Sequence, residues 1–314
     1  MPAGVAGHAG PAAGTRRGAA RRLGGGPRAG RPVPAPGRTA RTPGRSGVSA
    51  PSLRPQVLED DGAIGEAAAD RILTGLAEAV RQGRAYVLGC PAGRSPRTTY
   101  AALARRVAAR QLDLSRLHLV MMDEYVLREP DGWSLCPRDA HYSCMGFGER
   151  EIRQALNAGL PPSRHVPPGR LHGPDPGDPA GYDRLIGRLG GVDVFLLASG
   201  ASDGHVAFNP PGTPLEARTQ LVELAESTRR DNLGTFPQFE GLDAVPRWGV
   251  SISPGSIMRL SRAALLLLPG EGRATALRRV AVGWDPSWPA SIIHLCQNPA
   301  ILTDRAAWAA META

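Results

Sequence analysis

The feature that most constrains the fold is an alternation, from Gln56 onward, of short continuously apolar segments with segments whose apolar residues recur every three or four positions. A strand that is apolar along its whole length is buried on both faces, which is typical of a parallel sheet covered by helices. We therefore predict, over residues 55–314, a single Rossmann-like α/β domain: a mostly parallel sheet with helices on both faces. The expected strands are 85–88, 117–122, 192–198, 248–253 and 263–268, and the expected helices are 97–110, 182–189, 272–282 and one that starts at Asp60 or Asp61 and ends at Gly83.

Residues 1–54 differ from the rest of the chain in charge and composition. They contain ten Arg, no Asp or Glu, 12 Gly and 8 Pro, whereas residues 55–314 carry 27 Arg against 29 acidic residues. The formal charge of +8 therefore divides into +10 for this segment and −2 for the remainder. Such a segment buries too little apolar area to offset its ordering entropy, so we predict a disordered Arg/Gly/Pro-rich extension. A basic arm for nucleic acid or anionic membrane, and a transit peptide, are the alternatives to a plain low-complexity extension.

The chain contains no Lys, so all 37 basic residues are Arg. This excludes Schiff-base aldolases, pyridoxal enzymes and Walker-type phosphate loops, which all need an amine. The four cysteines lack the paired spacing of a zinc or disulfide framework, so we expect a cytoplasmic protein. No run of 18 apolar residues is present, which argues against a membrane span. Nucleic acid is not expected as a partner, because residues 55–314 are net acidic and have no basic stripe.

Candidate functional residues follow three of the expected strands, and ligands of such folds bind at the carboxyl ends of strands. The loop after strand 85–88 is rich in Gly and Pro and leads into a helix. Backbone amides, a helix N-terminus and a Ser hydroxyl are suited to holding a phosphate. A plain turn between strand and helix is the alternative. The phosphate loop would consist of Ala92, Gly93, Arg94 and Ser95.

Acidic and imidazole side chains follow the other two strands. Asp123 and Glu124 close strand 117–122, where partial burial raises the pKa of a carboxylate toward that of a useful base. A solvated strand end or a helix cap is the structural alternative. Asp203 and His205 flank a Gly after strand 192–198. A carboxylate orients a neighbouring imidazole for proton transfer, so this pair indicates function rather than a structural histidine.

Taken in order, these segments resemble the superfamily of glucosamine-6-phosphate deaminases and 6-phosphogluconolactonases, and in particular its deaminase/isomerase branch. The branch is indicated by DEYV at 123–126, AFN at 207–209 and LEART at 215–219, because the lactonases typically have DER at the first of these places and Thr and Ser after DGH. The resemblance covers roughly residues 60–308. The matching stretches are LGCPAGRSPRTTY (88–100), LVMMDEYV (119–126), HYSCM (141–145), VDVFLLASGASDGHVAFNPPGTPLEART (192–219) and WPASIIHLCQNPAILTDRAA (288–307).

The resemblance implies a reaction and a role for each candidate residue. Asp123 would move a proton between C1 and C2 of an amino-sugar phosphate, and His205, oriented by Asp203, would assist ring opening. The 92–95 loop and Arg273, which falls where the family has a phosphate-binding Lys, would hold the phosphate. The implied function is conversion of a glucosamine 6-phosphate-like substrate to a ketose phosphate with release of ammonia, without a metal or an organic cofactor. The number of subunits is left open, a homo-oligomer included.

Several positions depart from the family pattern. The family's deaminases have a Glu directly after AFN, where it tunes the catalytic His, and this chain has Pro210. A family Arg for the substrate phosphate falls at Gly234, so Arg229 or Arg230 would have to compensate.

Two further departures concern regulation and reaction class. The basic residues that some members use to bind an allosteric activator fall at Gln220 and Val222, so we expect no such activation. A 6-phosphogluconolactonase-type hydrolase is the alternative enzyme, which Pro210 fits better and DEYV fits worse. A non-catalytic sugar-phosphate-binding protein is the alternative from another class.

Overall fold

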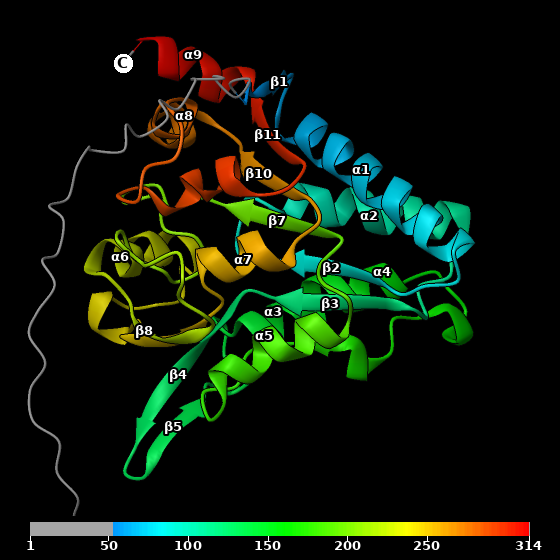
Figure 1. Ribbon diagram of the computed structural model, residues 1–314, viewed down its shortest axis with the longest axis horizontal. Helices are drawn as coiled ribbons and strands as arrows, with labels where there is room; N and C mark the ends of the chain where they lie inside the picture. The colour runs from blue at the N-terminus through cyan, green and yellow to red at the C-terminus, as the bar shows by residue number, and fades with distance from the viewer. Residues whose placement is uncertain (1–52, 314) are drawn as a thin grey trace, which may run out of the picture. The chain divides into compact units, whose positions relative to one another are not determined.

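The structure is a computed structural model that describes residues 53–313, so the extension predicted at 1–54 lies almost entirely outside the described residues. The described part is built around a seven-stranded sheet in the order β1-β11-β10-β7-β2-β3-β6, with all neighbouring strands parallel (Figure 1). Its strands are β1 Gln56–Leu58, β2 Tyr86–Cys90, β3 Leu117–Met121, β6 Leu171–His172, β7 Val194–Ala198, β10 Ala264–Leu268 and β11 Pro299–Asp304.

Helices cover both faces of this sheet, which confirms the predicted fold class. Successive strand residues enter two separate cores: Leu196 of β7 packs with one helix layer, and Phe195 and Leu197 pack with the other. The first layer contains α1 Asp61–Arg81, α2 Arg97–Arg110, α3 Cys144–Phe147 and α4 Ala155–Asn157. The second contains α5 Pro179–Arg188, α7 Pro254–Leu260, α8 Ala274–Ala281 and α9 Arg305–Thr313. None of the helices in residues 53–313 is long and apolar enough to cross a membrane.

The predicted helices are confirmed with small shifts at their ends. Asp60 caps α1, because its carboxylate accepts a hydrogen bond from the amide of Ala63 at 2.8 Å. Helix α5 starts earlier than predicted, at Pro179, because Asp178 supplies the cap. The segment predicted as helix 272–282 begins with a 3₁₀ turn at Glu271–Arg273 and continues as α8.

A second, four-stranded antiparallel sheet lies beside the parallel one. Its order is β5-β4-β9-β8, with strands β4 Asp123–Glu129, β5 Gly132–Leu135, β8 Gln220–Glu223 and β9 Trp248–Ser251. Segment 248–253 is therefore a strand, as predicted, but it was wrongly expected in the parallel sheet. An apolar run shows that a strand is buried and does not identify its partners.

The carboxyl ends of β2, β3 and β7 meet at one edge of the parallel sheet. Strand β3 passes into β4 through Met122 alone, so Asp123 stands where the chain leaves one sheet and enters the other. Strands β2 and β7 are neighbours whose next strands within this sheet lie on opposite sides: β3 follows β2 on one side, and β10 comes after β7 on the other. Such a switch point opens a crevice, and this crevice is where a ligand is expected.

The contact of α1 with α2 generates a stability prediction. A Cβ added to Gly65 of α1 would lie 2.6 Å from the backbone carbonyl carbon of Thr98, which cannot move away. We expect Gly65→Ala to lower the free energy of unfolding by about 1–3 kcal/mol. Gly187→Ala in α5 is the matched control: no atom lies within 4 Å of its added Cβ, and helix propensity should raise stability by about 1 kcal/mol. Urea denaturation measures both, and equal effects would contradict the close approach.

Candidate active site

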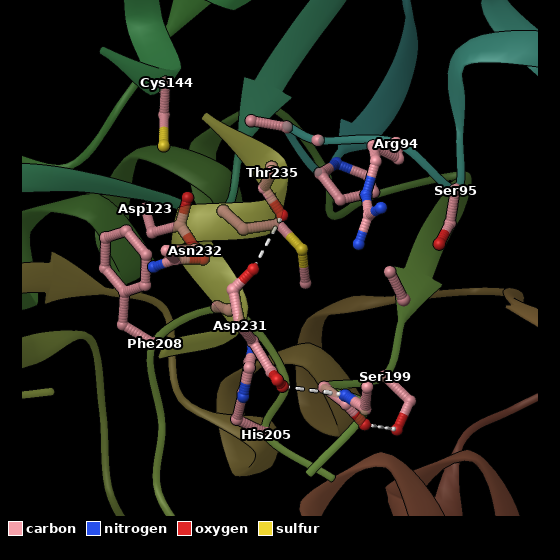
Figure 2. Close-up of a pocket in the computed structure, with 18 of the residues that line it drawn as sticks. Arg94, Ser95, Asp123, Cys144, Ser199, His205, Phe208, Asp231, Asn232 and Thr235 are labelled. Carbon is pink, nitrogen blue, oxygen red and sulfur yellow. Dashed lines mark hydrogen bonds between the residues drawn. The ribbon is translucent and has the colours of Figure 1, made fainter. Parts of the chain in front are cut away.

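A pocket opens at the carboxyl edge of the parallel sheet, between the loops that follow β2 and β7 (Figure 2). Its walls are these two loops, the link between β3 and β4, and one face of α6, Glu226–Thr235. Seven of the eight residues predicted for the site line the pocket: Ala92, Gly93, Arg94, Ser95, Asp123, His205 and Arg273. The eighth, Asp203, hydrogen-bonds to the pocket residue His205.

The loop after β2 supplies backbone and hydroxyl donors. Gly93 has a φ of +101°, a conformation that disfavours residues with a Cβ. The Ser95 hydroxyl is buried and lies 3.4 Å from Nη2 of Arg273. Helix α2 starts two residues later, so its free N-terminal amides lie close to the same wall. An anion at this wall has hydroxyl, guanidinium and amide donors within reach.

Arg94 and Arg273 bring two positive charges to the same wall. Within residues 53–313, neither guanidinium forms an ion pair with a carboxylate. Burial lowers the pKa of Arg273, the charge of Arg94 lowers it further, and Asp231 opposes this. Two like charges, one of them largely buried, form an unfavourable pair that a bound anion relieves.

Arg229 and Arg230 do not compensate for the family Arg at the Gly234 position. The buried Arg229 donates hydrogen bonds to the backbone carbonyls of 242 and 245, and the exposed Arg230 pairs with Glu226, so neither lines the pocket. A Cβ on Gly234 would lie 3.6 Å from Nη2 of Arg94. The Arg94 guanidinium therefore lies beside Gly234, the position at which the resemblance implies a family Arg.

The two adjacent acids have different surroundings. Asp123 lines the pocket, whereas Glu124 points away from it and is 1% exposed. Glu124 organises the start of α3, so it is a structural carboxylate. Its oxygens accept five hydrogen bonds at 2.7–3.3 Å, from the amides of Tyr125, Cys144 and Met145, the Ser143 hydroxyl and the Cys136 thiol.

Asp123 has few partners to stabilise its charge. Burial raises the pKa of this carboxyl to about 7; a hydrogen bond with Cys144 opposes the shift, the charge of Glu124 adds to it, and His205 opposes it. A carboxyl that titrates near neutrality can both accept and release a proton.

Asp203 and His205 form a tight pair in the loop after β7. The Asp203 carboxylate accepts hydrogen bonds from Nδ1 of His205 at 2.7 Å and from its amide at 3.0 Å. Burial alone raises the pKa of Asp203, but the hydrogen bonds and charge of His205 outweigh it, and Ser227 adds to them, so the pKa lies well below its usual range. Asp203 therefore stays ionised and fixes the orientation of the imidazole.

Sequence reasoning missed the contribution of α6. Asp231, Asn232 and Thr235 line the pocket, and Asn232 donates a hydrogen bond to the hydroxyl of Tyr125 at 2.6 Å. Their i, i+1, i+4 spacing places them on one face of a helix, which was the available signal. Cys144, Ser199 and Phe208 also line the pocket without having been singled out.

The fold and the pocket define a doubly wound α/β protein with an acid/base site at its switch point. The family model of glucosamine-6-phosphate isomerases/6-phosphogluconolactonase matches residues 59–302. A glucosamine-6-phosphate deaminase of Bacillus velezensis is 32% identical over 237 residues, which are 74% of this chain and 90% of that protein. One of Cutibacterium acnes is 33% identical over 253 residues, 80% of this chain and 89% of that protein.

Solved structures agree with these matches. A monomeric glucosamine-6-phosphate deaminase aligns with a TM-score of 0.70 and 26% identity, over 82% of this chain and 100% of that one. A 6-phosphogluconolactonase of Thermotoga maritima shares the fold, with a TM-score of 0.54 and 20% identity over 80% of this chain and 98% of that one. The chain belongs to the family of glucosamine-6-phosphate isomerases and 6-phosphogluconolactonases.

The raised pKa of Asp123 predicts how stability depends on pH. The unfolded carboxyl has its ordinary pKa of 3.8 and the folded one about 7, so between these values unfolding releases a proton and stability falls as the pH rises. The loss is complete above about pH 7 and amounts to about 4 kcal/mol. Asp123→Asn cannot ionise, so its stability relative to the wild type should increase from about pH 4 to about pH 8 in thermal unfolding. The exposed Asp243→Asn is the control, and a difference independent of pH would contradict the burial of an uncompensated carboxyl.

Proposed function

We propose that the chain is a glucosamine-6-phosphate deaminase, which couples an aldose-to-ketose isomerisation to the release of ammonia. The observation that carries the proposal is a buried carboxyl with a pKa of about 7, Asp123, in one pocket with the Asp203–His205 pair and two guanidinium groups. The relatives above 30% identity that the chain matches along most of its length are named deaminases, which supports the same reaction.

The substrate phosphate binds at the cationic wall. Arg94 and Arg273 supply paired N–H donors that match phosphate oxygens, and Ser95 adds a hydroxyl. Asp123 and His205 lie across the pocket from this wall (Figure 2). A sugar anchored by its 6-phosphate therefore presents its other end to the acid/base groups.

Ring opening is the first task of the site. Because Nδ1 of His205 is held by Asp203, Nε2 is the ring nitrogen free to exchange a proton with the substrate. His205 gives a proton to the ring oxygen as the C1–O5 bond breaks, and the imidazole then takes up the proton that the C1 hydroxyl loses. The product is the open-chain aldehyde.

Asp123 then transfers a proton from C2 to C1. Its carboxylate removes the C2 proton while the substrate's ammonium group gives a proton to the aldehyde oxygen, which yields an enolamine. The carboxyl of Asp123 then returns its proton to C1, which leaves a protonated imine at C2. Water adds to the imine carbon and ammonia leaves, so the products are the ketose phosphate and ammonia. A pKa near 7 suits a group that acts as base and then as acid in one turnover.

Hydrolysis of a lactone needs no proton transfer between C1 and C2, so it makes less use of Asp123. Pro210 fits the lactonase better, which keeps this reaction as the alternative, together with a non-catalytic sugar-phosphate-binding protein. We place the reaction in the cytoplasm, because all four cysteines are buried and free. A sugar phosphate is the only partner that the proposed reaction requires, and a homo-oligomer stays a prediction.

Turnover of glucosamine 6-phosphate tests the proposal. The wild type should release ammonia and fructose 6-phosphate in equal amounts, with kcat/KM rising with pH through about 7 as Asp123 ionises. Asp123→Asn should lower kcat by about 10²- to 10⁴-fold. A screen with galactosamine 6-phosphate and 6-phosphogluconolactone completes the measurement. No turnover of any hexosamine phosphate would falsify the proposal. Hydrolysis of the lactone alone would show that the protein is a lactonase. Calorimetric binding of a sugar phosphate without any turnover would show that it is a non-catalytic binding protein.

The cationic wall generates a second prediction. Arg94→Ala and Arg273→Ala should each raise KM by about 10- to 100-fold, because each removes hydrogen bonds to a charged group, and each should weaken inhibition by inorganic phosphate. Arg230→Ala, which removes an exposed Arg outside the pocket, is the control and should leave KM unchanged. A wild-type KM in both wall variants would place the phosphate elsewhere.

A further inference from the structure

Helix α6 holds the loop that carries the Asp203–His205 pair. The hydroxyls of Ser227 and Thr228, in its first turn, donate hydrogen bonds to Oδ2 of Asp203 at 2.5 and 3.0 Å. Both oxygens of the Asp203 carboxylate are thus engaged, Oδ1 by His205 and Oδ2 by α6.

Asp231 holds the same loop one turn further along α6. Its Oδ2 accepts hydrogen bonds from the amides of Ala201 and Ser202 at 2.9 and 3.1 Å, and its Oδ1 accepts one from the Ser202 hydroxyl at 2.6 Å. One carboxylate therefore fixes the start of the loop that follows β7 and carries Asp203 and His205, which is called the catalytic loop below. Ser227, Thr228 and Asp231 lie on one helix face, because they are separated by one, three and four positions.

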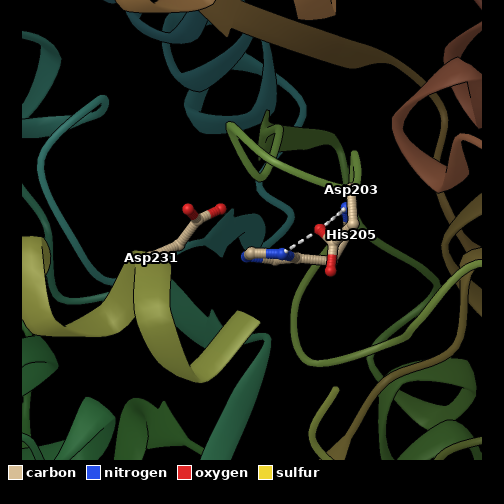
Figure 3. A group of neighbouring side chains, drawn as sticks. All are labelled: Asp203, His205 and Asp231. Atoms are coloured by element: carbon tan, nitrogen blue, oxygen red, sulfur yellow. Dashed lines mark hydrogen bonds and ion pairs between the residues drawn. The ribbon is translucent and has the colours of Figure 1, made fainter. Parts of the chain in front are cut away.

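Asp231 also lies beside the imidazole. One ligand atom from each of Asp203, His205 and Asp231 lies within 4.8 Å of the other two. Figure 3 shows the imidazole between the two carboxylates, with Asp203 from its own loop and Asp231 from α6. Asp231 lines the pocket, so it faces the substrate space as well.

A carboxylate in this place opposes phosphate binding. Asp231 shares the pocket with Arg94 and Arg273, and its charge acts on Arg273. Since like charges repel, Asp231 weakens the attraction of the site for a phosphate. Binding of the phosphate therefore does not explain Asp231, whereas its contacts with the loop that follows β7 do.

Two carboxylates and an imidazole can also hold a metal ion. Here the oxygens of both carboxylates already accept hydrogen bonds from donors that a cation would repel or displace: Ser227, Thr228 and His205 on Asp203, and Ala201 and Ser202 on Asp231. The donor pattern is that of a hydrogen-bonded network.

We propose that Asp231 is the positioning residue for His205: it anchors the catalytic loop and places a negative charge beside the imidazole. The charge stabilises the ring while it holds the proton destined for the ring oxygen. This proposal rests on the proposed deaminase function. Asp231 on α6 thus gives the site a second carboxylate next to the imidazole. Pro210 has no carboxylate and does not line the pocket, so it cannot do the same.

The test compares three full-length variants. Asp231→Asn keeps the size and removes the charge, and should lower kcat by about 10- to 100-fold with KM unchanged or lower, because a repulsive charge is removed. Asp231→Glu keeps the charge and should recover part of kcat. Glu226→Gln removes an exposed carboxylate from the same helix and should match the wild type. A wild-type kcat in Asp231→Asn, or a loss confined to KM, overturns the proposal.

Amide hydrogen exchange separates this inference from the proposed function. The amides of Ala201 and Ser202 should exchange faster in Asp231→Ala, which removes the acceptor, than in the wild type and Glu226→Gln, because Asp231 accepts both. Unchanged exchange overturns the anchoring role even in an active enzyme. If the wild type shows no deaminase activity, the proposed function is wrong, and the amide exchange rates alone then decide whether Asp231 anchors the catalytic loop. If a chelator abolished turnover and a divalent cation restored it, Asp203, His205 and Asp231 would be interpreted as a metal site instead of a hydrogen-bonded network.

Discussion

The position of every group in the pocket depends on the divergence of the chain after two neighbouring parallel strands, β2 and β7. Parallel strands present their carboxyl ends at one edge, so loops far apart in the sequence meet there. Within the parallel sheet, the next strand after β2 lies on one side and the next strand after β7 on the other, which opens a crevice between the two strand ends. Met122 adds to this constraint, since the single-residue link brings Asp123 into the second sheet while it still faces the crevice.

Within this crevice, the surroundings of each acid decide its chemistry. Glu124 is surrounded by five donors and is structural, while the adjacent Asp123 has a thiol partner and a raised pKa. Successive residues of a strand point to opposite sides, so neighbours in sequence enter different environments. Asp203 shows the opposite effect to Asp123: dense hydrogen bonding keeps it ionised despite its burial. Three carboxylates at one sheet edge therefore differ in state: Glu124 is fixed by hydrogen bonds, Asp123 has a raised pKa, and Asp203 stays ionised beside the imidazole.

The sequence was sufficient to predict the fold class and the three strand ends, because apolar runs and Gly-rich loops are local signals. It was insufficient wherever a role depends on which surfaces meet. The membership of segment 248–253 in a second sheet depends on pairing with β4 and β8. Two further contacts depend on how α6 packs against the sheet edge: Arg94 lies beside Gly234, and Asp231 accepts hydrogen bonds from the catalytic loop. Arg229 and Arg230 were plausible by spacing, yet they lie on faces of α6 that point away from the pocket.

The all-arginine character of the cationic wall has a consequence for the chemistry of the substrate itself. The proposed reaction passes through an open-chain aldose, and a free aldehyde condenses readily with a primary amine. Arg94 and Arg273 present guanidinium groups, whose delocalised electrons make them poor nucleophiles toward such a carbonyl. A chain without Lys has no side-chain amine for its sugar to modify. In the proposed reaction the open-chain aldehyde would therefore meet no side-chain amine in the pocket.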